Sequence, residues 1–415
     1  MISERTCIAV VGAGIAGLTV AVALARDGLR CHLLEQARLL SDVGAGIQLT
    51  PNATRLLHRF GIADRLREVA VAPRAIEMRR WNDNSVLCRI PLGEECEQRF
   101  GAPYYTVHRA DLHRCLLERL PEGTVHLGLN CTSVAQHPDG VQLQFADGRR
   151  ITPDLVVGAD GIHSRVRGLL IRDEPRYSGQ SIYRALVPAE RVPFLLDEPK
   201  VVLWLGPGKH CVSYPVSGGR QISLAATVPH PHWIAESWSA PGRVQDLARA
   251  YAGWNREVQA LTSAPSTVSR WALHDRESLS RWSTDRVTLI GDAAHPMLPF
   301  HAQGANQAIE DAVALATCLR DACPPSIAAA FSRYEQARVP RTSEVYRISR
   351  ANTTALHLPD GEAQRSRDHA LASGAALADH EWIFDYDAQA AVRDVTAGPP
   401  GRGESWTGSG TRSLS

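Results

Sequence analysis

The sequence predicts an α/β fold in which a parallel sheet covered by helices is interleaved with an antiparallel sheet and followed by C-terminal helices. Three observations support this prediction. Near the N-terminus an apolar strand, a glycine turn, a helix and a second strand follow one another directly. Two later apolar strands end in Asp-Gly or Gly-Asp, at Asp160 and Asp292. Between residues 181 and 270, short alternating runs are separated by Gly-Pro and Gly-Gly turns, which is typical of antiparallel strands.

Length and composition limit the function. The chain has 415 residues, enough for two domains that share a large core. Its formal charge is +1 with 21% charged residues, so it lacks the basic field that would hold nucleic acid. The nine cysteines include no C-x-x-C pair, which indicates reduced structural thiols, and no metal site is predicted. No leader precedes Cys7, and no apolar run approaches a membrane span. We therefore expect a soluble cytoplasmic protein, a monomer or homodimer, that uses neither nucleic acid nor membrane.

The N-terminal unit begins with the apolar strand Cys7 to Val11, which leads into the glycine turn Gly12-Ala13-Gly14-Ile15-Ala16-Gly17. A helix over Leu18 to Asp27 follows, and then the strand Cys31 to Leu34, which ends at Glu35. The first glycine permits the tight turn, the second lets backbone N–H groups approach a pyrophosphate, and the third allows close helix packing. Glu35 would accept hydrogen bonds from an adenosine ribose. The alternative is a chance glycine turn, but the complete unit favours a Rossmann-like dinucleotide site. The fingerprint occurs once, so no second nucleotide domain is expected.

Two further segments allow two interpretations each. The stretch Val43 to Ala53 contains Gly44-Ala45-Gly46 and leads into an amphipathic helix. It is either an ordinary loop with Asn52 as the helix cap, or a mobile glycine loop that faces a cofactor ring. Arg109 stands at the start of another helix. It could reach a phosphate or a ribityl chain, or it could be a surface arginine.

A hairpin over Val141 to Ile151 precedes the buried strand Leu155 to Val157, which ends in Gly158-Ala159-Asp160-Gly161. Residues Ser164 to Arg167 are expected to open a helix. Asp160 is then a capping carboxylate for helix N–H groups, a ligand-binding residue, or both.

The second sheet is predicted from alternating strands over Ile76 to Trp81, Val86 to Ile90, Val201 to Leu205, Cys211 to Pro215 and Ile222 to Val228. Residues Trp233 to Trp254 have a helical pattern instead. His210 and Tyr214 are four positions apart, and residues an even number apart on a strand share a face. Both could point into one pocket. The alternative is a buried tyrosine and an exposed histidine.

The segment Arg286 to Asp311 contains a strand, a loop and the start of a helix, and it is the central element of the prediction. Val287 to Ile290 is a short buried strand that stops at Gly291-Asp292, and a helical pattern resumes at Gly304 after a proline-broken loop. Such a junction places a carboxylate and free backbone N–H groups at one point, which suits a ligand with hydroxyls and a partly anionic ring. Together with the N-terminal unit, it predicts one extended dinucleotide across the sheet edge.

The organisation along the chain follows from these elements. The helix after Asp311 should run to about Asp321, where Pro324-Pro325 breaks it, and another should cover Ile327 to Arg338. We predict a discontinuous cofactor-binding domain over 1–75, 104–180 and 271–325, a substrate-binding sheet domain over 76–103 and 181–270, a C-terminal helical region over 326–397, and a disordered tail over 398–415.

Three motifs in order make the chain resemble the single-component FAD-dependent aromatic hydroxylases, which are built like p-hydroxybenzoate hydroxylase: Gly12 to Gly17 with Glu35, Gly158-Ala159-Asp160-Gly161, and Gly291-Asp292-Ala293-Ala294-His295-Pro296. Within this family the chain is similar to the branch of salicylate hydroxylase, 3-hydroxybenzoate 6-hydroxylase and 6-hydroxynicotinate 3-monooxygenase. Shorter matches are Gly44-Ala45-Gly46-Ile47, Thr106 to Leu112, Ala302-Gln303-Gly304-Ala305 and Trp382 to Asp387. The resemblance runs from about residue 5 to 388.

The resemblance implies bound FAD and NAD(P)H as a transient co-substrate. The FAD-binding positions that it implies are Gly12, Ala13, Gly14, Gly17, Glu35 and Gln36 at the ADP half, Arg109, Asp292 at the ribityl hydroxyls, and Gly304 with Ala305. Asp160 is similar to the residue credited with a dual role near FAD and NAD(P)H. Enzymes of this kind bind NAD(P)H without a separate nucleotide domain, which explains the single fingerprint.

The resemblance also implies that O₂ hydroxylates a phenolic or hydroxylated heteroaromatic substrate, carboxylated in this branch, through a flavin C4a-hydroperoxide, with or without decarboxylation. A phenolate is a better nucleophile than a phenol, so a base must lie near the substrate oxygen and water must be excluded. His210 and Tyr214 match positions credited with this activation. Gln48, Pro299, Phe300 and His301 are expected to line the pocket. Gln48 and Phe300 stand where the hydroxynicotinate enzyme looks to have histidines.

Two other classes compete with this interpretation. A flavin dehydrogenase or oxidase of the same fold would insert no oxygen into its product. A flavin-binding redox sensor would oxidise NAD(P)H regardless of any aromatic compound. The complete loop from Gly291 to Gly304 favours the hydroxylase over both.

Overall fold

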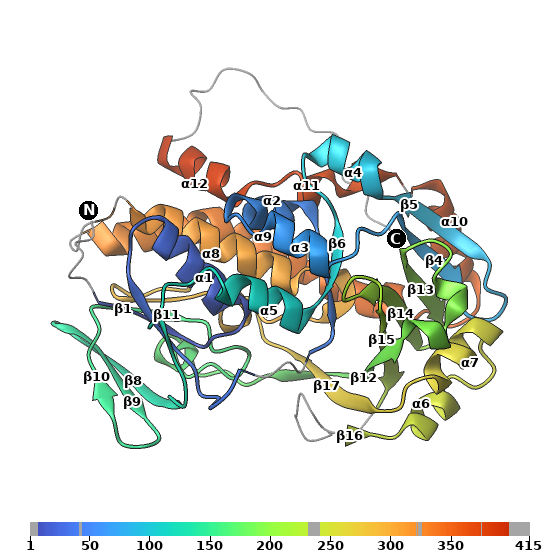
Figure 1. Ribbon diagram of the computed structural model, residues 1–415, viewed down its shortest axis with the longest axis horizontal. Helices are drawn as coiled ribbons and strands as arrows, with labels where there is room; N and C mark the ends of the chain where they lie inside the picture. The colour runs from blue at the N-terminus through green and yellow to red at the C-terminus, as the bar shows by residue number, and fades with distance from the viewer. Residues whose placement is uncertain are drawn as a thin grey trace.

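The parallel sheet lies at one end of the molecule (Figure 1). The structure is a computed structural model that describes residues 7–40, 44–230, 241–320, 322, 326–374 and 376–397. Strand order in this sheet is β18-β11-β1-β2-β7, and every neighbouring pair is parallel. Its strands are β1 (Ile8–Val11), β2 (Cys31–Leu34), β7 (Val125–His126), β11 (Leu155–Gly158) and β18 (Val287–Leu289). Because the strands are parallel, the glycine turn, Glu35, Asp160 and Asp292 all follow carboxyl ends at one edge.

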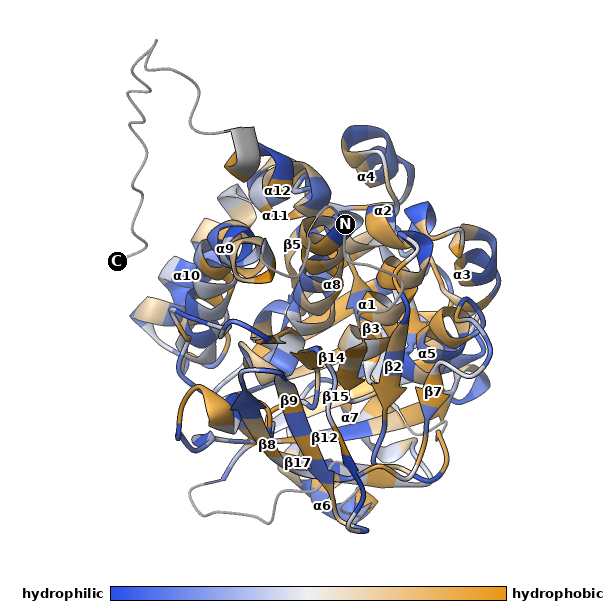
Figure 2. Ribbon diagram, turned by 90° about the vertical axis from the view of Figure 1, so that its left-hand side faces the viewer, coloured by the Kyte–Doolittle hydropathy of each residue, from blue (hydrophilic) through white to orange (hydrophobic). Residues whose placement is uncertain are grey.

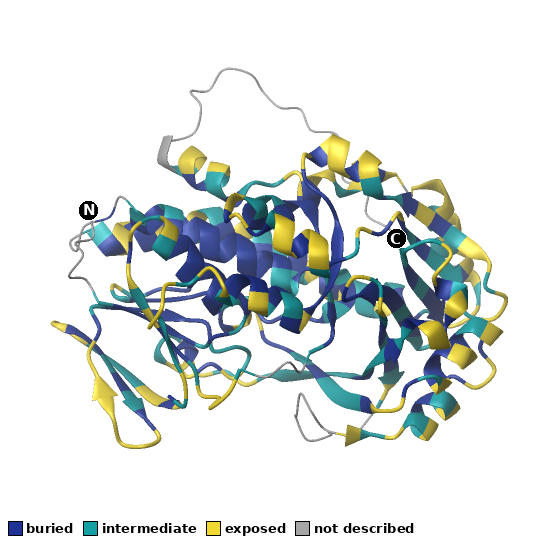
Figure 3. Cartoon of the chain, viewed as in Figure 1, coloured by how far each residue is buried: buried dark blue, intermediate teal, exposed yellow. Residues whose placement is uncertain are grey.

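Helices α1 (Ile15–Arg26) and α8 (Gly304–Arg320) pack together beside this sheet. Figure 3 shows α8 as the most buried long helix, and its buried residues include the polar side chains Asn306, Gln307, Glu310 and Asp311. Helix α1 begins at Ile15, so Gly17 lies within its first turn rather than before it. Further helices are α2 (Pro51–Arg59), α3 (Ala63–Val69) and α5 (Arg109–Leu117).

Two small sheets attach to this part. One has the order β10-β9-β8 and includes the predicted hairpin, with β8 (Cys131–His137), β9 (Gly140–Phe145) and β10 (Arg150–Ile151). The other pairs β3 (Gly46–Leu49) with β6 (Tyr105–His108) in antiparallel register. Ser164 to Arg167 do not open an α-helix as predicted. The segment forms turns and the short 3₁₀ helix η1 (Arg167–Leu169), because the Asp160 side chain already bonds the nearby backbone N–H groups.

The antiparallel sheet occupies the other end of the molecule and has eight strands in the order β16-β17-β12-β15-β14-β13-β4-β5. These are β4 (Ala75–Arg80), β5 (Val86–Pro91), β12 (Arg176–Pro188), β13 (Lys200–Gly206), β14 (Lys209–Val216), β15 (Gln221–Pro229), β16 (Pro241–Gly242) and β17 (Val268–Asp275). The pair β4–β13 is parallel and the others are antiparallel. The sheet extends beyond the predicted range 181–270 at both ends, from Arg176 to Asp275.

The described part of the chain contains further helices. They are α4 (Gly93–Phe100), α6 (Val244–Ala250), α7 (Arg256–Ser263), α9 (Ile327–Ala355), α10 (Glu362–Ser373), α11 (Glu381–Phe384) and α12 (Ala388–Ala397), with the 3₁₀ helices η2 (Ala189–Arg191), η3 (Pro193–Leu195), η4 (Gly291–Ala293), η5 (Pro299–His301) and η7 (Leu377–His380). Hydrophilic residues are prominent on α3, α4 and α10 (Figure 2). Among the described residues no helix is long and apolar enough to cross a membrane.

Helix α9 does not end near Arg338 as predicted but continues through Pro340 to Ala355. A proline costs one helical hydrogen bond, and packing of α9 against α8 and η5 outweighs that loss. Of the predicted helical stretch Trp233 to Trp254, residues 233–240 lie outside the described residues, and α6 occupies much of the rest. The predicted break at Asp321 and Pro324-Pro325 and the tail 398–415 also lie outside them.

Candidate active site

The glycine turn after β1 packs so tightly against neighbouring backbone that Gly12 and Gly17 leave no space for a Cβ atom. Gly12 has φ +101°, and a Cβ there would lie 2.5 Å from the Ala159 carbonyl oxygen. A Cβ on Gly17 would lie 1.9 Å from the Gly12 carbonyl oxygen. At the end of β2, Glu35 Oε2 accepts the Ala13 N–H at 2.8 Å, and Oε1 accepts the Ala37 N–H at 2.8 Å. Each oxygen keeps a lone pair for ribose hydroxyls, since a carboxylate accepts up to about four hydrogen bonds. Gln36 is exposed beside it.

Arg109 begins α5 beside the same turn. A Cβ on Gly14 would lie 3.7 Å from Arg109 Nη2, so the guanidinium borders the pyrophosphate position of the motif. Within the described residues this guanidinium has no hydrogen-bond or ion-pair partner, and the residue is exposed. The surrounding protein nevertheless removes enough hydration to lower the pKa of Arg109, which Asp292 and Glu35 oppose. Arg109 thus lies near two acids beside the glycine turn, and its contact with a phosphate or ribityl chain stays a prediction.

Asp292 follows β18 in η4. Its carboxylate is accessible to solvent and bonds to no described residue. Loss of hydration raises its pKa, while His295 and Arg109 lower it, with the first effect larger. Gly291 has φ +58° and lies against α1 and α8, since its Cβ would meet Ala16 Cβ at 3.0 Å and Ala308 Cβ at 3.2 Å. The carboxylate is thus held at the sheet edge by a closely packed backbone, free to accept hydrogen bonds from a polyol.

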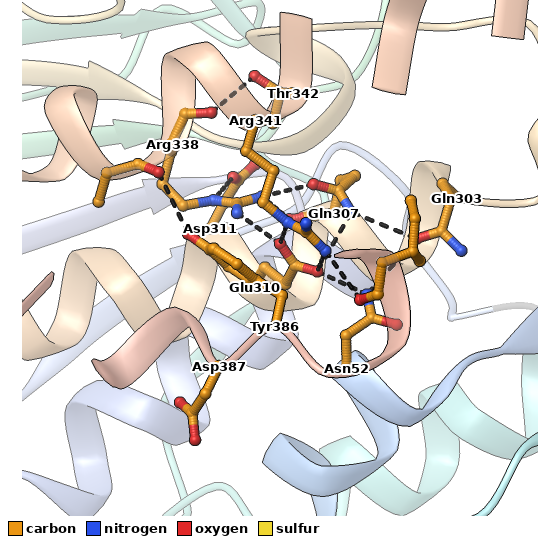
Figure 4. Close-up of polar contacts among 12 residues, drawn as sticks. Asn52, Gln303, Gln307, Glu310, Asp311, Arg338, Arg341, Thr342, Tyr386 and Asp387 are labelled. Carbon is orange, nitrogen blue, oxygen red and sulfur yellow. Dashed lines mark hydrogen bonds and ion pairs between the residues drawn. The ribbon is translucent and has the colours of Figure 1, made fainter. Parts of the chain in front are cut away.

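A buried polar cluster in α8 and α9 fixes this loop. Asp311 Oδ2 accepts the Gly291 N–H at 3.0 Å and lies 2.5 Å from His295 Nε2. Arg338, fully buried on α9, pairs with Asp311 and with Glu310 (Figure 4). Sequence reasoning missed this cluster. Its signal was two adjacent acids, Glu310-Asp311, in an otherwise apolar helix, because charges buried together need cations beside them.

Asp160 has the capping geometry that was one of its two interpretations. Oδ1 accepts the Ser164 hydroxyl at 2.5 Å, and Oδ2 accepts the N–H groups of Arg165 at 2.7 Å and Val166 at 3.2 Å. Burial raises the pKa of Asp160 despite these hydrogen bonds. The same segment carries the buried Arg167, which donates to the carbonyls of Ala293 at 3.1 Å and Ala294 at 2.8 Å. Asp160 therefore shapes a segment that supports the Asp292 loop, and its role near NAD(P)H stays a prediction.

Tyr214 and Gln48 meet where β14 approaches β3. Tyr214 is buried, and a Cβ on Gly46 would lie 2.5 Å from its Cε2 and 2.5 Å from Ser223 Oγ, so only glycine fits there. Burial raises the pKa of Tyr214, while Arg184 and hydrogen bonds to Ser223 and Gln48 lower it less. Gln48 Oε1 also accepts the Tyr104 hydroxyl at 2.5 Å. The structure thus brings the glycine loop 44–46 and Tyr214 together, a contact that no sequence pattern predicts.

His210 lies further along the same face of β14. It is 5% exposed, which excludes the alternative of an exposed histidine. Its Nδ1 lies 2.7 Å from Nε2 of His357, beyond the end of α9, and the Phe300 ring packs against it with centroids 5.4 Å apart. Burial, and secondarily His357, lower the pKa of His210 well below its usual value. The imidazole is therefore held in its neutral form near pH 7, and its catalytic role stays a prediction.

The loop before α8 faces this sheet. In η5, Phe300 packs on His210, and its carbonyl accepts Asn352 Nδ2 at 2.9 Å. His301 Nε2 is buried without a hydrogen-bond partner among the described residues. Burial, with His380 nearby, lowers the pKa of His301 to about 4. Pro299 is half-buried, and Gly304 and Ala305 begin α8 directly after this loop. Phe300, rather than His301, contacts His210.

These residues fit FAD. The glycine turn, Arg109 and Asp292 follow the length of an extended dinucleotide along one sheet edge, and neither side chain has a partner in the described part of the chain. The second sheet faces the far end. Fold and site together define a flavin-dependent oxidoreductase with a separate substrate face.

The comparisons agree. Residues 5–349 match the family described as FAD binding domain. The chain is 50% identical over 386 residues to 3-amino-4-hydroxybenzoate 2-monooxygenase PtmB3 of Streptomyces platensis, covering 93% of this chain and 97% of that one. It is 40% identical over 349 residues to 6-hydroxynicotinate 3-monooxygenase of Bordetella bronchiseptica, covering 83% and 91%. The crystal structure of Klebsiella pneumoniae HpxO with FAD and uric acid superposes with a TM-score of 0.81 at 29% identity, covering 96% and 98%.

The chain belongs to the FAD-dependent aromatic monooxygenases. The predicted family, fold, cofactor and enzyme class are thereby confirmed.

Proposed function

We propose that this enzyme hydroxylates an amino-hydroxybenzoate of the 3-amino-4-hydroxybenzoate type at the ring carbon between the amino and carboxylate groups. The observation that carries the proposal is the 50% identity to the Streptomyces enzyme with that activity along nearly the whole of both chains. Relatives named for hydroxynicotinate and hydroxybenzoate are more distant, at 40% and 35% identity. NAD(P)H and O₂ are the co-substrates. FAD, when bound, accepts hydride from NAD(P)H and activates O₂.

The position of attack determines what the protein must do. Ring carbon 2 of 3-amino-4-hydroxybenzoate is ortho to the amino group and meta to the hydroxyl. The nitrogen lone pair, rather than the phenolate, therefore supplies electron density to this carbon. As the new carbon–oxygen bond forms, positive charge develops on the nitrogen, and its N–H becomes acidic. A neutral base beside the nitrogen accepts that proton. His210 suits this role because its lowered pKa keeps the imidazole unprotonated and its Nε2 bonds to no described residue.

Three other residues complete the proposed substrate site. Tyr214 keeps its proton because burial raises its pKa, so it serves as a hydrogen-bond donor to a substrate oxygen. Gln48 offers amide groups where the hydroxynicotinate enzyme looks to have a histidine, which suits an amino substituent. Arg184, on β12 of the same sheet face, lies over the Trp271 ring at 4.9 Å and has no acidic partner among the described residues, which suits the carboxylate.

The experiment uses the purified yellow protein with NADH or NADPH and catalase, in the presence of aminobenzoates, hydroxybenzoates, hydroxypyridines and 3-amino-4-hydroxybenzoate. We expect 3-amino-4-hydroxybenzoate to stimulate NAD(P)H oxidation most and to gain one oxygen atom, labelled when ¹⁸O₂ is supplied. Equal stimulation by a simple hydroxybenzoate would contradict the proposed substrate. Stimulation without label in any product would contradict oxygen insertion. We also propose a cytoplasmic location, which the eight free cysteines among the described residues support.

A further inference from the structure

A second histidine touches the proposed base from a distant part of the chain. His357 lies between α9 and α10, 147 positions from His210, and its Nε2 is 2.7 Å from His210 Nδ1. The two rings are stacked, with centroids 5.0 Å apart and an interplanar angle of 19°. Both side chains are buried, at 5% and 8% exposure. A nitrogen-to-nitrogen distance this short requires that one ring donates and the other accepts.

The surroundings hold the pair in one arrangement. Thr227 Oγ1 on β15 accepts the His210 backbone N–H at 2.9 Å and lies 3.4 Å from both His210 Nδ1 and His357 Nε2. Phe300 packs edge-on against both imidazoles, with each ring centroid 5.4 Å away. The His357 carbonyl accepts the Gly208 N–H at 3.0 Å, which ties the α9–α10 junction to the turn before β14. The contact is therefore part of the packed structure of the substrate sheet.

The hydrogen bond leaves one nitrogen of His210 available. No described residue bonds to His210 Nε2, so this nitrogen is the one that can meet a ligand. For Nε2 to act as a base, the neutral ring must carry its proton on Nδ1 and donate it to His357 Nε2. His357 accepts that hydrogen bond only when its own Nε2 is unprotonated. The contact therefore accommodates the tautomer that His210 needs.

We propose that His357 is a positioning and proton-relay residue for His210. The proposal rests on the proposed function, because it takes His210 as the group that accepts the substrate proton. When Nε2 of His210 takes that proton, the Nδ1 proton of His210 passes to Nε2 of His357. His357 then carries a proton on each nitrogen and holds the positive charge until it releases one of them. Its Nδ1 is buried near the Thr353 carbonyl.

The charged groups near the pair agree with a relay. Burial lowers the pKa of His357 to about 4, with the nearby Thr353 carbonyl opposing and Arg367 of α10 adding to the effect. No carboxylate contributes to the pKa of either ring. Imidazoles that face an arginine and no acid release protons readily, whereas a neighbouring carboxylate would trap the charge on the ring.

The test compares two variants at His357 with a matched control. His357→Phe keeps the ring packing against His210 and Phe300 but removes both nitrogens. His357→Gln keeps a group that can accept the Nδ1 hydrogen bond but cannot pass a proton on. His369→Phe is the control, because His369 is exposed on the neighbouring helix α10. The substrate is 3-amino-4-hydroxybenzoate with NAD(P)H, and the wild-type enzyme is measured beside the variants.

We expect His357→Phe to lower kcat for hydroxylated product at least about tenfold, as loss of a proton-transfer partner does. Its KM and its rate of flavin reduction by NAD(P)H should stay within about twofold of wild type. His357→Gln should remain slow. The single-turnover rate of product formation should be measured in mixtures of H₂O and D₂O. A plot of this rate against the deuterium fraction should be curved for the wild type and linear for both variants.

The outcomes separate the two proposals. If the wild-type enzyme makes no hydroxylated product from 3-amino-4-hydroxybenzoate, the proposed function fails. If wild type is active and His357→Phe matches it in kcat and deuterium dependence, the relay is wrong while the function stands. Full rescue by His357→Gln would also overturn the relay, because glutamine can position His210 but cannot transfer a proton.

Discussion

The Asn52 side-chain amide donates a hydrogen bond to Glu310 Oε1 at 2.5 Å, joining the start of α2 to the middle of α8 through fully buried groups. The same nitrogen lies 3.4 Å from Gln303 Oε1 in the loop before α8. Asn52 thus links the start of α2 with the loop 299–303, and it makes no cap bond to its own helix. Figure 4 shows this link at one end of the buried charge cluster.

Replacing Asn52 with leucine should lower the free energy of unfolding by about 1–3 kcal/mol, because Glu310 loses a buried donor that leucine cannot supply. Urea denaturation of the flavin-free protein measures the change. Gln98→Leu on the exposed side of α4 is the control, and it should stay within about 0.5 kcal/mol of wild type. An unchanged midpoint for Asn52→Leu would mean that Gln307, Arg338 and Arg341 satisfy Glu310 without Asn52.

Glu310 and Asp311 should make stability sensitive to acid. Burial alone would raise their pKa values, but Arg338 and Arg341 lower that of Glu310, and His295 and Arg338 lower that of Asp311. Carboxyls with lowered folded-state pKa values stabilise the protein fully above their unfolded pKa, about 4, and lose this contribution as pH falls further. The free energy of unfolding should therefore fall steeply below about pH 4. Asp311→Asn should flatten that fall, whereas the exposed Asp285→Asn should not.

Asp292→Ala should lose bound flavin while the fold remains. Its carboxylate has no bond to the described protein, so its removal costs little stability but removes the acceptor proposed for the ribityl hydroxyls. The ratio of flavin to protein absorbance after gel filtration, with circular dichroism for the fold, measures this. Asp285→Ala, at an exposed position just before β18, serves as the control. A fully loaded Asp292→Ala protein would count against the ribityl role.

Much of the fold could be predicted from the sequence because it depends on local patterns. Hydrophobic periodicity, with Gly, Pro or Asp at the ends of the elements, indicates several of them directly. These are the glycine turn, the strands ending at Asp160 and Asp292, and the alternating strands of the second sheet. The contacts that define the site are different. Asn52 to Glu310 and His210 to His357 join residues 258 and 147 positions apart, and no local pattern reports such a pair.

Two errors have physical reasons of the same kind. The local pattern around Pro340 predicts a helix that ends near Arg338, but tertiary packing on α8 carries α9 to Ala355. Ser164 to Arg167 resemble a helix start, but Asp160 bonds the N–H groups of Arg165 and Val166 within a turn instead. In both places side-chain contacts outweighed local propensity.

Arg184→Met should weaken binding of carboxylated substrates. Arg184 is half-buried on the face that carries Tyr214, and burial lowers its pKa, which Tyr214 opposes. Removing a partly buried cation that pairs with a ligand carboxylate should raise KM about tenfold or more, since a charged hydrogen bond contributes about 1.5–3 kcal/mol. Steady-state kinetics with 3-amino-4-hydroxybenzoate and with ortho-aminophenol, which lacks the carboxylate, measure the effect. The Michaelis constant for ortho-aminophenol should change little, and an equal rise for both compounds would contradict the carboxylate contact.

His210→Ala should keep the yellow FAD complex and lose aromatic hydroxylation. The imidazole contacts Phe300 and His357 but lies on the second sheet, away from the glycine turn and Asp292, so cofactor binding does not depend on it. Removing a general base lowers kcat by about 10²–10⁴-fold. NAD(P)H oxidation should then continue slowly, with peroxide in place of hydroxylated product, which catalase and product mass spectrometry reveal. His369→Ala on the exposed face of α10 should behave as wild type. If His210→Ala retains near wild-type product formation with normal flavin content, His210 is structural and its assignment as the base is wrong.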